Sequence, residues 1–115
     1  MKLPFFQKVV ISETKIKGYL LSASHPYGHH KAVFFKSFGF NPESWRGMAS
    51  AIREHAERCE LVRIVETEYG TRYVVEGELK TPDGRNPVVR IVWFVEKGKS
   101  FPHLVTAYPL GRDYD

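Results

Sequence analysis

The hydrophobic pattern of this chain changes once, at Cys59, and that change limits the folds open to it more than any other feature. Up to about Arg58 the apolar residues recur at helical spacing. Beyond Cys59 they form runs rich in Val, Ile, Tyr and Trp, which turn residues interrupt at short intervals. Connections this short cannot hold crossover helices, so consecutive strands must pair antiparallel. The sequence therefore predicts an α+β fold, with about three N-terminal helices followed by a four-stranded antiparallel β-meander.

Three helices are expected in the first half of the chain. Ser12 can cap a short first helix, and a second helix should run over about 29–38 and stop at Gly39. Asn41 followed by Pro42 marks the start of a third helix, because Asn caps well and Pro fits the first turn. The side chains expected to face the core from these helices are Ile16, Tyr19, Leu20, Phe34, Phe35, Phe38, Trp45, Met48, Ala49, Ile52 and Ala56.

Four strands are expected in the second half, over about 60–67, 71–79, 87–96 and 102–108. Turn residues at Tyr69-Gly70, at 81–84 and at Gly98 supply the reversals between them. Because helices packed on one face of such a sheet leave the other face uncovered, that second face stays available for function. The chain has no linker, repeat or charge block, so residues 1–115 are interpreted as a single domain.

Basic residues gather at the front of the chain. The whole chain has 17 Lys and Arg against 13 Asp and Glu, a net charge of +4. Residues 1–40 hold six lysines and the single acidic residue Glu13, an excess of five positive charges, while the remainder carries one net negative charge. Such a basic N-terminal part suits the binding of a polyanion such as RNA or DNA, because neutralised phosphates release counterions. The alternative is that these lysines form the solvated faces of two helices.

No stretch of the sequence is apolar enough to span a membrane. The longest apolar run, 91–95, has five residues, against the roughly 20 that a spanning helix needs. Lys8 and its neighbour Gln7 interrupt any apolar secretion signal near the N-terminus, so a cytoplasmic location is expected. A single cysteine, Cys59, cannot form an internal disulfide and is interpreted as structural.

The densest polar cluster consists of His25, His29, His30 and Lys31. Histidine transfers protons near neutral pH, and lysine can bind a phosphate and lower the pKa of a neighbouring histidine. His29 and His30 would point about 100° apart on a helix, and no Asp or Glu lies within ten residues of the cluster. Neither a metal ion nor a cofactor is therefore expected. The alternative for His29 and His30 is a pair of surface histidines without function.

The predicted sheet offers a second set of candidates. Arg90 lies mid-strand among apolar residues, where an unpaired charge would be costly. It should therefore either pair with a carboxylate such as Glu76 or face a pocket that binds anions. On the last strand, alternation is expected to put Leu104, Thr106 and Tyr108 on one side. Two hydroxyls at this spacing suit contact with a phosphate, although Thr also simply favours strands.

Strings of residues along nearly the whole chain resemble a bacterial family known as domain of unknown function 6883. In the first half they are Gly18-Tyr19-Leu20-Leu21, His25-Pro26 through Gly28 to Lys31-Ala32, Phe34-Phe35 and Gly39-Phe40. In the second half they are Tyr69-Gly70, 73–77, 82–85, Val89-Arg90 with Val92-Trp93, and 104–109. Members look similar to domains of phage-associated and polymorphic-toxin proteins, often fused to larger chains. The resemblance implies a bacterial protein and brings little established function.

The expected architecture also resembles the metal-independent ribonuclease superfamily of barnase, EndoU and RelE. The resemblance rests on helices followed by a four-stranded sheet, an early histidine, an arginine within the sheet and the Thr-Ala-Tyr-Pro ending. It implies that His25 acts as general base or acid and that Lys31 and Arg90 stabilise the phosphorane charge. Thr106 and Tyr108 would orient the scissile phosphate. The RNA 2′-hydroxyl would attack its own phosphate, which requires no metal or cofactor.

Three functional hypotheses follow. The first is a small ribonuclease, a toxin-like module with RNA as its substrate and a cognate immunity or antitoxin protein as its partner. The second is a non-catalytic module that binds nucleic acid or protein, for which exposed Tyr27, Tyr69 or Trp93 could stack on bases or anchor an interface. The third is a metal-dependent hydrolase centred on the histidines. No residue pattern fixes an oligomeric state.

Overall fold

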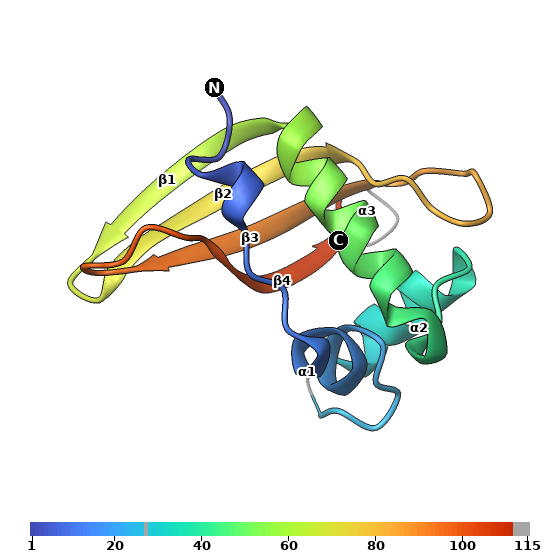
Figure 1. The fold of residues 1–115 in the computed structure, drawn as a ribbon. Helices are drawn as coiled ribbons and strands as arrows, with labels where there is room; N and C mark the ends of the chain where they lie inside the picture. Colours follow the sequence, from blue (N-terminus) through green and yellow to red (C-terminus); the bar gives the residue numbers. More distant parts are fainter. Residues whose placement is uncertain (27, 112–115) are drawn as a thin grey trace.

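Four antiparallel strands form one sheet, in the order β1-β2-β3-β4 (Figure 1). The computed structural model describes residues 1–26 and 28–111. Each strand pairs with the next along the chain, and every boundary lies within one residue of the expected one. The strands are β1 (Glu60–Thr67), β2 (Gly70–Glu78), β3 (Val88–Glu96) and β4 (His103–Pro109). The predicted α+β fold and antiparallel meander are confirmed.

The helical segments precede the sheet, as expected. They are η1 (Phe6–Lys8), α1 (Glu13–Lys15), the π-helical turn η2 (Ile16–Leu20), α2 (His29–Ser37), η3 (Pro42–Ser44) and α3 (Trp45–Arg58). Both predicted caps form: the Ser12 hydroxyl accepts a hydrogen bond from the Lys15 N–H at 3.0 Å, and the Asn41 side chain accepts one from the Ser44 N–H at 2.9 Å. Gly39 follows α2 with a φ of +104°, which favours glycine. Among the described residues, no helix has the length and apolar character needed to cross a lipid bilayer.

The helix α3 packs across one face of the sheet and supplies much of the core (Figure 1). Its buried side chains are Met48, Ala49, Ile52, His55 and Ala56. The sheet buries Val75, Val89, Ile91 and Trp93 completely. The sequence predicted this helical stripe except for His55, and it also included Trp45, which is only half-buried. The three inward phenylalanines of the 29–38 segment are buried as expected.

The N-terminal segment runs along the outer edge of β4. Val10 forms a parallel bridge with His103, in which the Val10 N–H donates to the Pro102 carbonyl at 2.8 Å and the Leu104 N–H donates to the Val10 carbonyl at 3.0 Å. These bonds satisfy part of the β4 edge, which would otherwise be open to another strand. Local sequence patterns gave no sign of this pairing, because its partners are far apart in the chain.

His55 is an ionisable residue that is completely buried in an apolar core. One ring nitrogen, Nε2, lies 3.2 Å from the Gly77 carbonyl oxygen, to which it donates in the neutral form. Burial lowers the pKa of His55 from 6.5 to about 4, because the imidazolium would lose its hydration there. His55 is therefore neutral in the folded protein at physiological pH.

This burial makes stability depend on pH. Below pH 6.5 the unfolded chain protonates at His55, whereas the folded chain does so only near pH 4. Acidification through this window therefore favours unfolding, by roughly 3 kcal/mol in total. We expect urea denaturation to show wild-type stability falling between pH 7 and pH 4, with a much smaller fall in His55→Gln. If the free energy of unfolding fell equally with pH in the two proteins, His55 would not be the group responsible.

Candidate functional site

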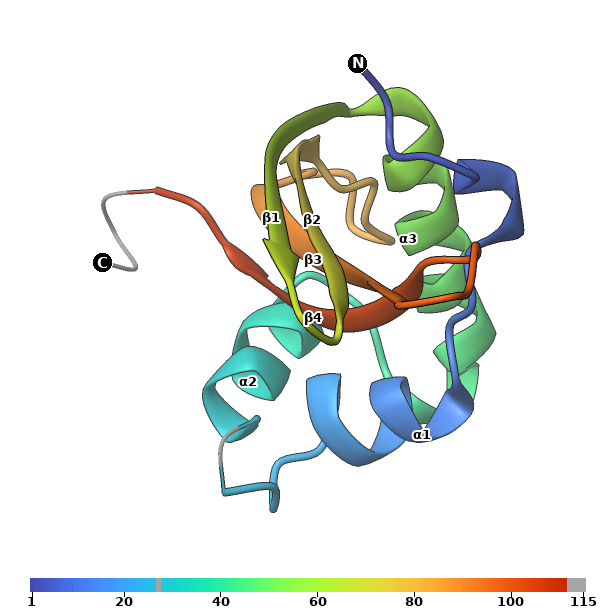
Figure 2. The same cartoon turned by 90° about the vertical axis from the view of Figure 1, so that its left-hand side faces the viewer.

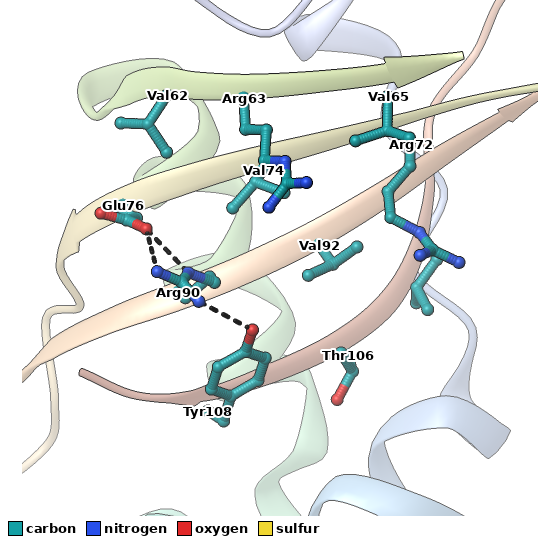
Figure 3. Close-up of a pocket in the computed structure, with 11 residues that line it drawn as sticks. Val62, Arg63, Val65, Arg72, Val74, Glu76, Arg90, Val92, Thr106 and Tyr108 are labelled. Atoms are coloured by element: carbon teal, nitrogen blue, oxygen red, sulfur yellow. Dashed lines mark hydrogen bonds and ion pairs between the residues drawn. The ribbon is translucent and has the colours of Figure 1, made fainter. Parts of the chain in front are cut away.

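The face of the sheet opposite α3 carries a hollow of about 680 Å³ (Figure 3). No helix of the described residues crosses this face, and α2 lies beyond its β4 edge (Figure 2). We call this feature the sheet hollow. Its lining residues come from all four strands and are Val62, Arg63, Val65, Arg72, Val74, Glu76, Arg90, Val92, Val105, Thr106 and Tyr108. Val74 and Val92 are buried although no helix covers them, so they form its apolar floor.

A β-bulge in β1 directs Arg63 toward the sheet hollow. The register of the β1–β2 pair shifts between Leu61 and Arg63, which leaves Val62 as an extra residue. Side chains alternate along a strand, so an unbroken β1 would have put Arg63 on the α3 side together with Leu61. The sequence analysis did not select Arg63, and regular alternation would have placed it on the other face.

A second bulge, in β4, overturns one expectation. Trp93 pairs with Leu104, but the next β4 residue that pairs with β3 is Thr106, so Val105 is the extra residue. Leu104 therefore lies on the core side and is buried, whereas Thr106 and Tyr108 line the sheet hollow. The predicted grouping of Leu104 with the two hydroxyl residues is wrong, because a bulge interrupts the alternation of period two.

Arg90 is held in the sheet hollow by two neighbours. Its guanidinium donates to the Glu76 carboxylate at 2.7 Å and to the Tyr108 hydroxyl at 3.2 Å (Figure 3). Both partners lie directly opposite Arg90 on the adjacent strands. The hydrogen bonds that the guanidinium donates to Tyr108 and Glu76 raise its pKa, which keeps it charged. The sequence analysis offered two alternatives for Arg90, an ion pair with Glu76 or a position facing a pocket. The structure contains both, because the ion pair lies within the sheet hollow.

Two further arginines, Arg63 and Arg72, lie over the sheet hollow. Both are exposed, and neither has a hydrogen bond or ion pair with any residue in the described part of the chain. Among the lining residues, three guanidinium groups face one carboxylate, that of Glu76. Counted over the described residues, the hollow therefore has an excess of positive charge, and this favours an anionic ligand.

Tyr19 connects the sheet hollow to the helical half of the protein. Its hydroxyl lies 3.1 Å from Oγ1 of Thr106. Its ring packs edge to face on the His25 ring, with centroids 4.9 Å apart. The ammonium groups of Lys15 and Lys31 lie 5.1 Å and 5.6 Å from the same ring. The sequence analysis treated Tyr19 only as a core residue, although a tyrosine hydroxyl among buried positions signals a polar partner.

The loop that carries His25 is fixed against Tyr19. The Gly28 N–H donates to His25 Nδ1 at 3.0 Å, so the neutral imidazole carries its proton on Nε2. A Cβ atom at Gly28 would lie 2.5 Å from the Tyr19 carbonyl oxygen, which explains why glycine stands there. His25 lines a small depression beside Lys15 and does not line the sheet hollow.

Lys31 lies next to the sheet hollow, between α2 and β4. It lines a groove of about 560 Å³ together with His30, Val33, Phe34, Ser37, Tyr108 and Pro109, which we call the α2–β4 groove. Tyr108 lines both the groove and the sheet hollow, so the two lie next to each other at this residue.

The five predicted site residues are thus partly brought together. Arg90, Thr106 and Tyr108 share the sheet hollow. Lys31 adjoins it through the α2–β4 groove. His25 is connected to it only through Tyr19. The sequence analysis selected Arg90, Thr106 and Tyr108, which line the hollow, and did not select the arginines of β1 and β2.

The two remaining histidines of the cluster, His29 and His30, lie side by side. Adjacent helix positions are expected to diverge, yet the rings of His29 and His30 lie 3.8 Å apart at the first turn of α2. Within residues 1–26 and 28–111, no group of three or more His, Cys, Asp or Glu could hold a metal ion.

The candidate stacking aromatics differ in their exposure. Tyr69 is 72% exposed at the β1–β2 turn, whereas Trp93 is completely buried and cannot contact a ligand, because it lies on the α3 side of β3. Tyr27 lies outside the described residues. Cys59 is buried, and burial raises the pKa of its thiol, which suits a structural role.

A double-mutant cycle would test the connection between Tyr19 and the sheet. Tyr19→Phe removes the hydroxyl that meets Thr106 but keeps the ring against His25, and Thr106→Val removes the other partner. We expect each change to lower the free energy of unfolding by about 1 kcal/mol. The double variant should lose less than the sum of the two, because the bond can be lost only once. If the two losses of unfolding free energy, measured by urea denaturation, simply added in the double variant, the result would contradict the contact.

Comparison with known proteins gives one family and one fold. A family model described as a domain of unknown function (DUF6883) matches residues 2–111. A search of curated proteins finds no match. A chain of a solved contact-dependent growth inhibition toxin–immunity protein complex from Klebsiella pneumoniae 342 is similar, with a TM-score of 0.68 and 18% identity, over 92% of this chain and 97% of that chain. At this identity the similarity shows a shared fold.

Proposed function

For this chain, which belongs to the family described as domain of unknown function (DUF6883), we propose the function of a metal-independent endoribonuclease that uses the open face of its sheet. The proposal depends on one observation: a guanidinium and two hydroxyls share the sheet hollow, and a lysine and a histidine are held beside them. Cations, hydroxyls and an imidazole are the groups that cleavage of a phosphodiester requires.

The proposed position of the scissile phosphate is beside Tyr108. This residue lies where the sheet hollow meets the α2–β4 groove, with Arg90 in the first and Lys31 in the second. Both cations would stabilise the negative charge that develops on the phosphorane oxygens. The hydroxyls of Thr106 and Tyr108 would donate hydrogen bonds that orient the phosphate.

The proposed reaction is a transesterification within the RNA. The ribose 2′-hydroxyl attacks the adjacent phosphorus while a base takes its proton. The bond from phosphorus to the 5′-oxygen breaks, and an acid protonates the departing oxygen, which leaves a 2′,3′-cyclic phosphate and a 5′-hydroxyl. His25 is the proposed proton-transfer group, because imidazole titrates near neutral pH. A strand that passes Thr106 reaches Tyr19 next, and the His25 ring lies against Tyr19.

The shared fold supports a toxin-like role for this nuclease. The similar chain comes from a complex of a contact-dependent growth inhibition toxin with an immunity protein. We extend the proposal accordingly: the module acts as the toxic part of a bacterial conflict system and has a cognate immunity protein. An acidic immunity protein would suit the unneutralised arginines of the sheet hollow.

The direct test is incubation of the purified protein with tRNA and with a generic RNA in EDTA, followed by analysis of the product ends. We expect cleavage that persists in the chelator and leaves 2′,3′-cyclic phosphates. Cleavage that EDTA abolishes would point to the metal-dependent hydrolase instead. Intact RNA in every lane would remove the nuclease proposal.

A second candidate function is RNA binding without cleavage. One observation favours it: His25 contacts Tyr19 and lines a separate depression, so the strongest proton-transfer candidate is outside the sheet hollow. Salt-dependent binding of RNA that stays intact would support this alternative.

A further inference from the structure

Arg63 and Arg72 have no role in the chemistry proposed above, yet they are the least neutralised charges of the sheet hollow. They extend from β1 and β2, on the side of the hollow away from Tyr108 (Figure 3). Neither has a partner among the described residues, in contrast to Arg90 with its bond to Glu76. A charge left unpaired beside an apolar floor is suited to a ligand that supplies the opposite charge.

We infer that Arg63 and Arg72 bind backbone phosphates of a single-stranded RNA, next to the phosphate that is cleaved. This inference rests on the proposed function, and it names the substrate form that the site selects. The bound strand would run from the α2–β4 groove, past Tyr108 and across the sheet hollow to the two arginines.

The register of the strands supports two phosphate contacts rather than one. Arg63 lies opposite Val74, and Val65 lies opposite Arg72. The two arginines are therefore diagonal neighbours on one face, with side chains that start roughly 7–8 Å apart. Neighbouring phosphates of one strand have a comparable spacing, so each guanidinium can bind one phosphate.

The apolar floor accounts for the preference for a single strand. Val74 and Val92 lie between the two arginines and the Arg90 network, and Val65 lies beside Arg72 (Figure 3). An unstacked base has apolar faces that can cover these valines and can stack on a guanidinium plane. A duplex keeps its bases stacked and paired, and so it cannot fill the hollow in this way.

The test is a binding measurement that does not depend on cleavage. The probe is a short single-stranded RNA, 2′-O-methylated throughout, which cannot undergo attack by a 2′-hydroxyl. Fluorescence anisotropy over a range of salt concentrations would compare wild type with the double variant Arg63→Gln/Arg72→Gln. Arg53→Gln is the matched control, because Arg53 is an exposed arginine of α3, on the other face of the sheet. Thermal denaturation would verify that each variant folds.

We expect the double variant to bind the probe about tenfold or more weakly at low salt. The slope of log K against log salt should fall in magnitude by about 1.4, the value for two lost phosphate contacts on a single strand. Arg53→Gln should behave like wild type, and a methylated duplex of the same sequence should compete poorly. For cleavable RNA, the double variant should raise KM on long substrates.

The outcomes separate this inference from the nuclease proposal. Wild-type binding that is lost in the double variant supports the two arginine contacts even if no RNA is ever cleaved. An unchanged affinity and salt slope in the double variant overturns the inference, whether or not wild type cleaves RNA. Stronger competition by the duplex, or no binding of the single strand by wild type at any salt, also overturns it.

Discussion

Replacing His25 by alanine is expected to reduce RNA cleavage roughly 10²–10⁴-fold, the usual contribution of a positioned acid or base. The side chain is half-buried on a loop, where it packs on the Tyr19 ring and accepts a hydrogen bond from the Gly28 N–H, so its loss should cost about 1 kcal/mol of stability. The measurement is single-turnover cleavage of one RNA in EDTA, with unfolding curves for both proteins. The rate loss should appear in kcat more than in KM, because the role assigned to His25 is realised in the transition state.

The matched control is His103→Ala. His103 is an exposed histidine at the start of β4 and lines neither the sheet hollow, nor the α2–β4 groove, nor the depression beside Lys15. Its removal should leave cleavage unchanged. If His25→Ala cleaves RNA as fast as wild type, proton transfer must be assigned to another group, and Glu76 is the candidate because its carboxylate lies in the hollow.

Arg90→Gln should reduce cleavage roughly 10²–10³-fold, the cost of losing one charged donor to a developing oxyanion. Arg90 is the only one of the three hollow arginines whose guanidinium is bonded within the described residues, to Glu76 and to the Tyr108 hydroxyl. The substitution would leave both of these groups without their cation. The measurement is the same single-turnover assay, with the double variant of Arg63 and Arg72 for comparison.

The stability of Arg90→Gln decides between a functional and a structural role. Both members of the pair with Glu76 keep about a third of their side-chain surface exposed, at 36% and 28%. A pair with this exposure contributes only about 1 kcal/mol, so the variant should remain folded. Arg90→Lys, which keeps the charge but not the fork of donors, should recover part of the activity. An unfolded Arg90→Gln protein would mean that the ion pair serves the fold alone.

Element boundaries were predictable because the signals that set them are local. The Ser12 and Asn41 caps and the reversal at Gly39 act within a few residues of themselves, and all three appear in the structure as expected. The pairing of Arg90 with Glu76 was also within reach of the sequence, since short turns force neighbouring strands to pair.

The two bulges mark where local reasoning failed. Strand alternation predicts faces correctly only while the register is unbroken, and Val62 and Val105 each interrupt it. One extra residue moves every following side chain to the opposite face. Because of these bulges, Arg63 lines the sheet hollow, and Leu104 faces the core instead of lying on the same side as Thr106 and Tyr108. No property of either valine distinguishes it from its strand neighbours.

The sequence by itself therefore determined the order and type of the elements, the antiparallel sheet with one open face, and the strand residues Arg90, Thr106 and Tyr108 as candidates. Only the tertiary structure decided what surrounds them. The contact between Tyr19 and Thr106 joins residues 87 positions apart, and it is what brings the His25 loop to the edge of the sheet. Caps, turns and alternation result from interactions between near neighbours, whereas a site built across the sheet and the helices depends on packing that no short stretch of the chain encodes.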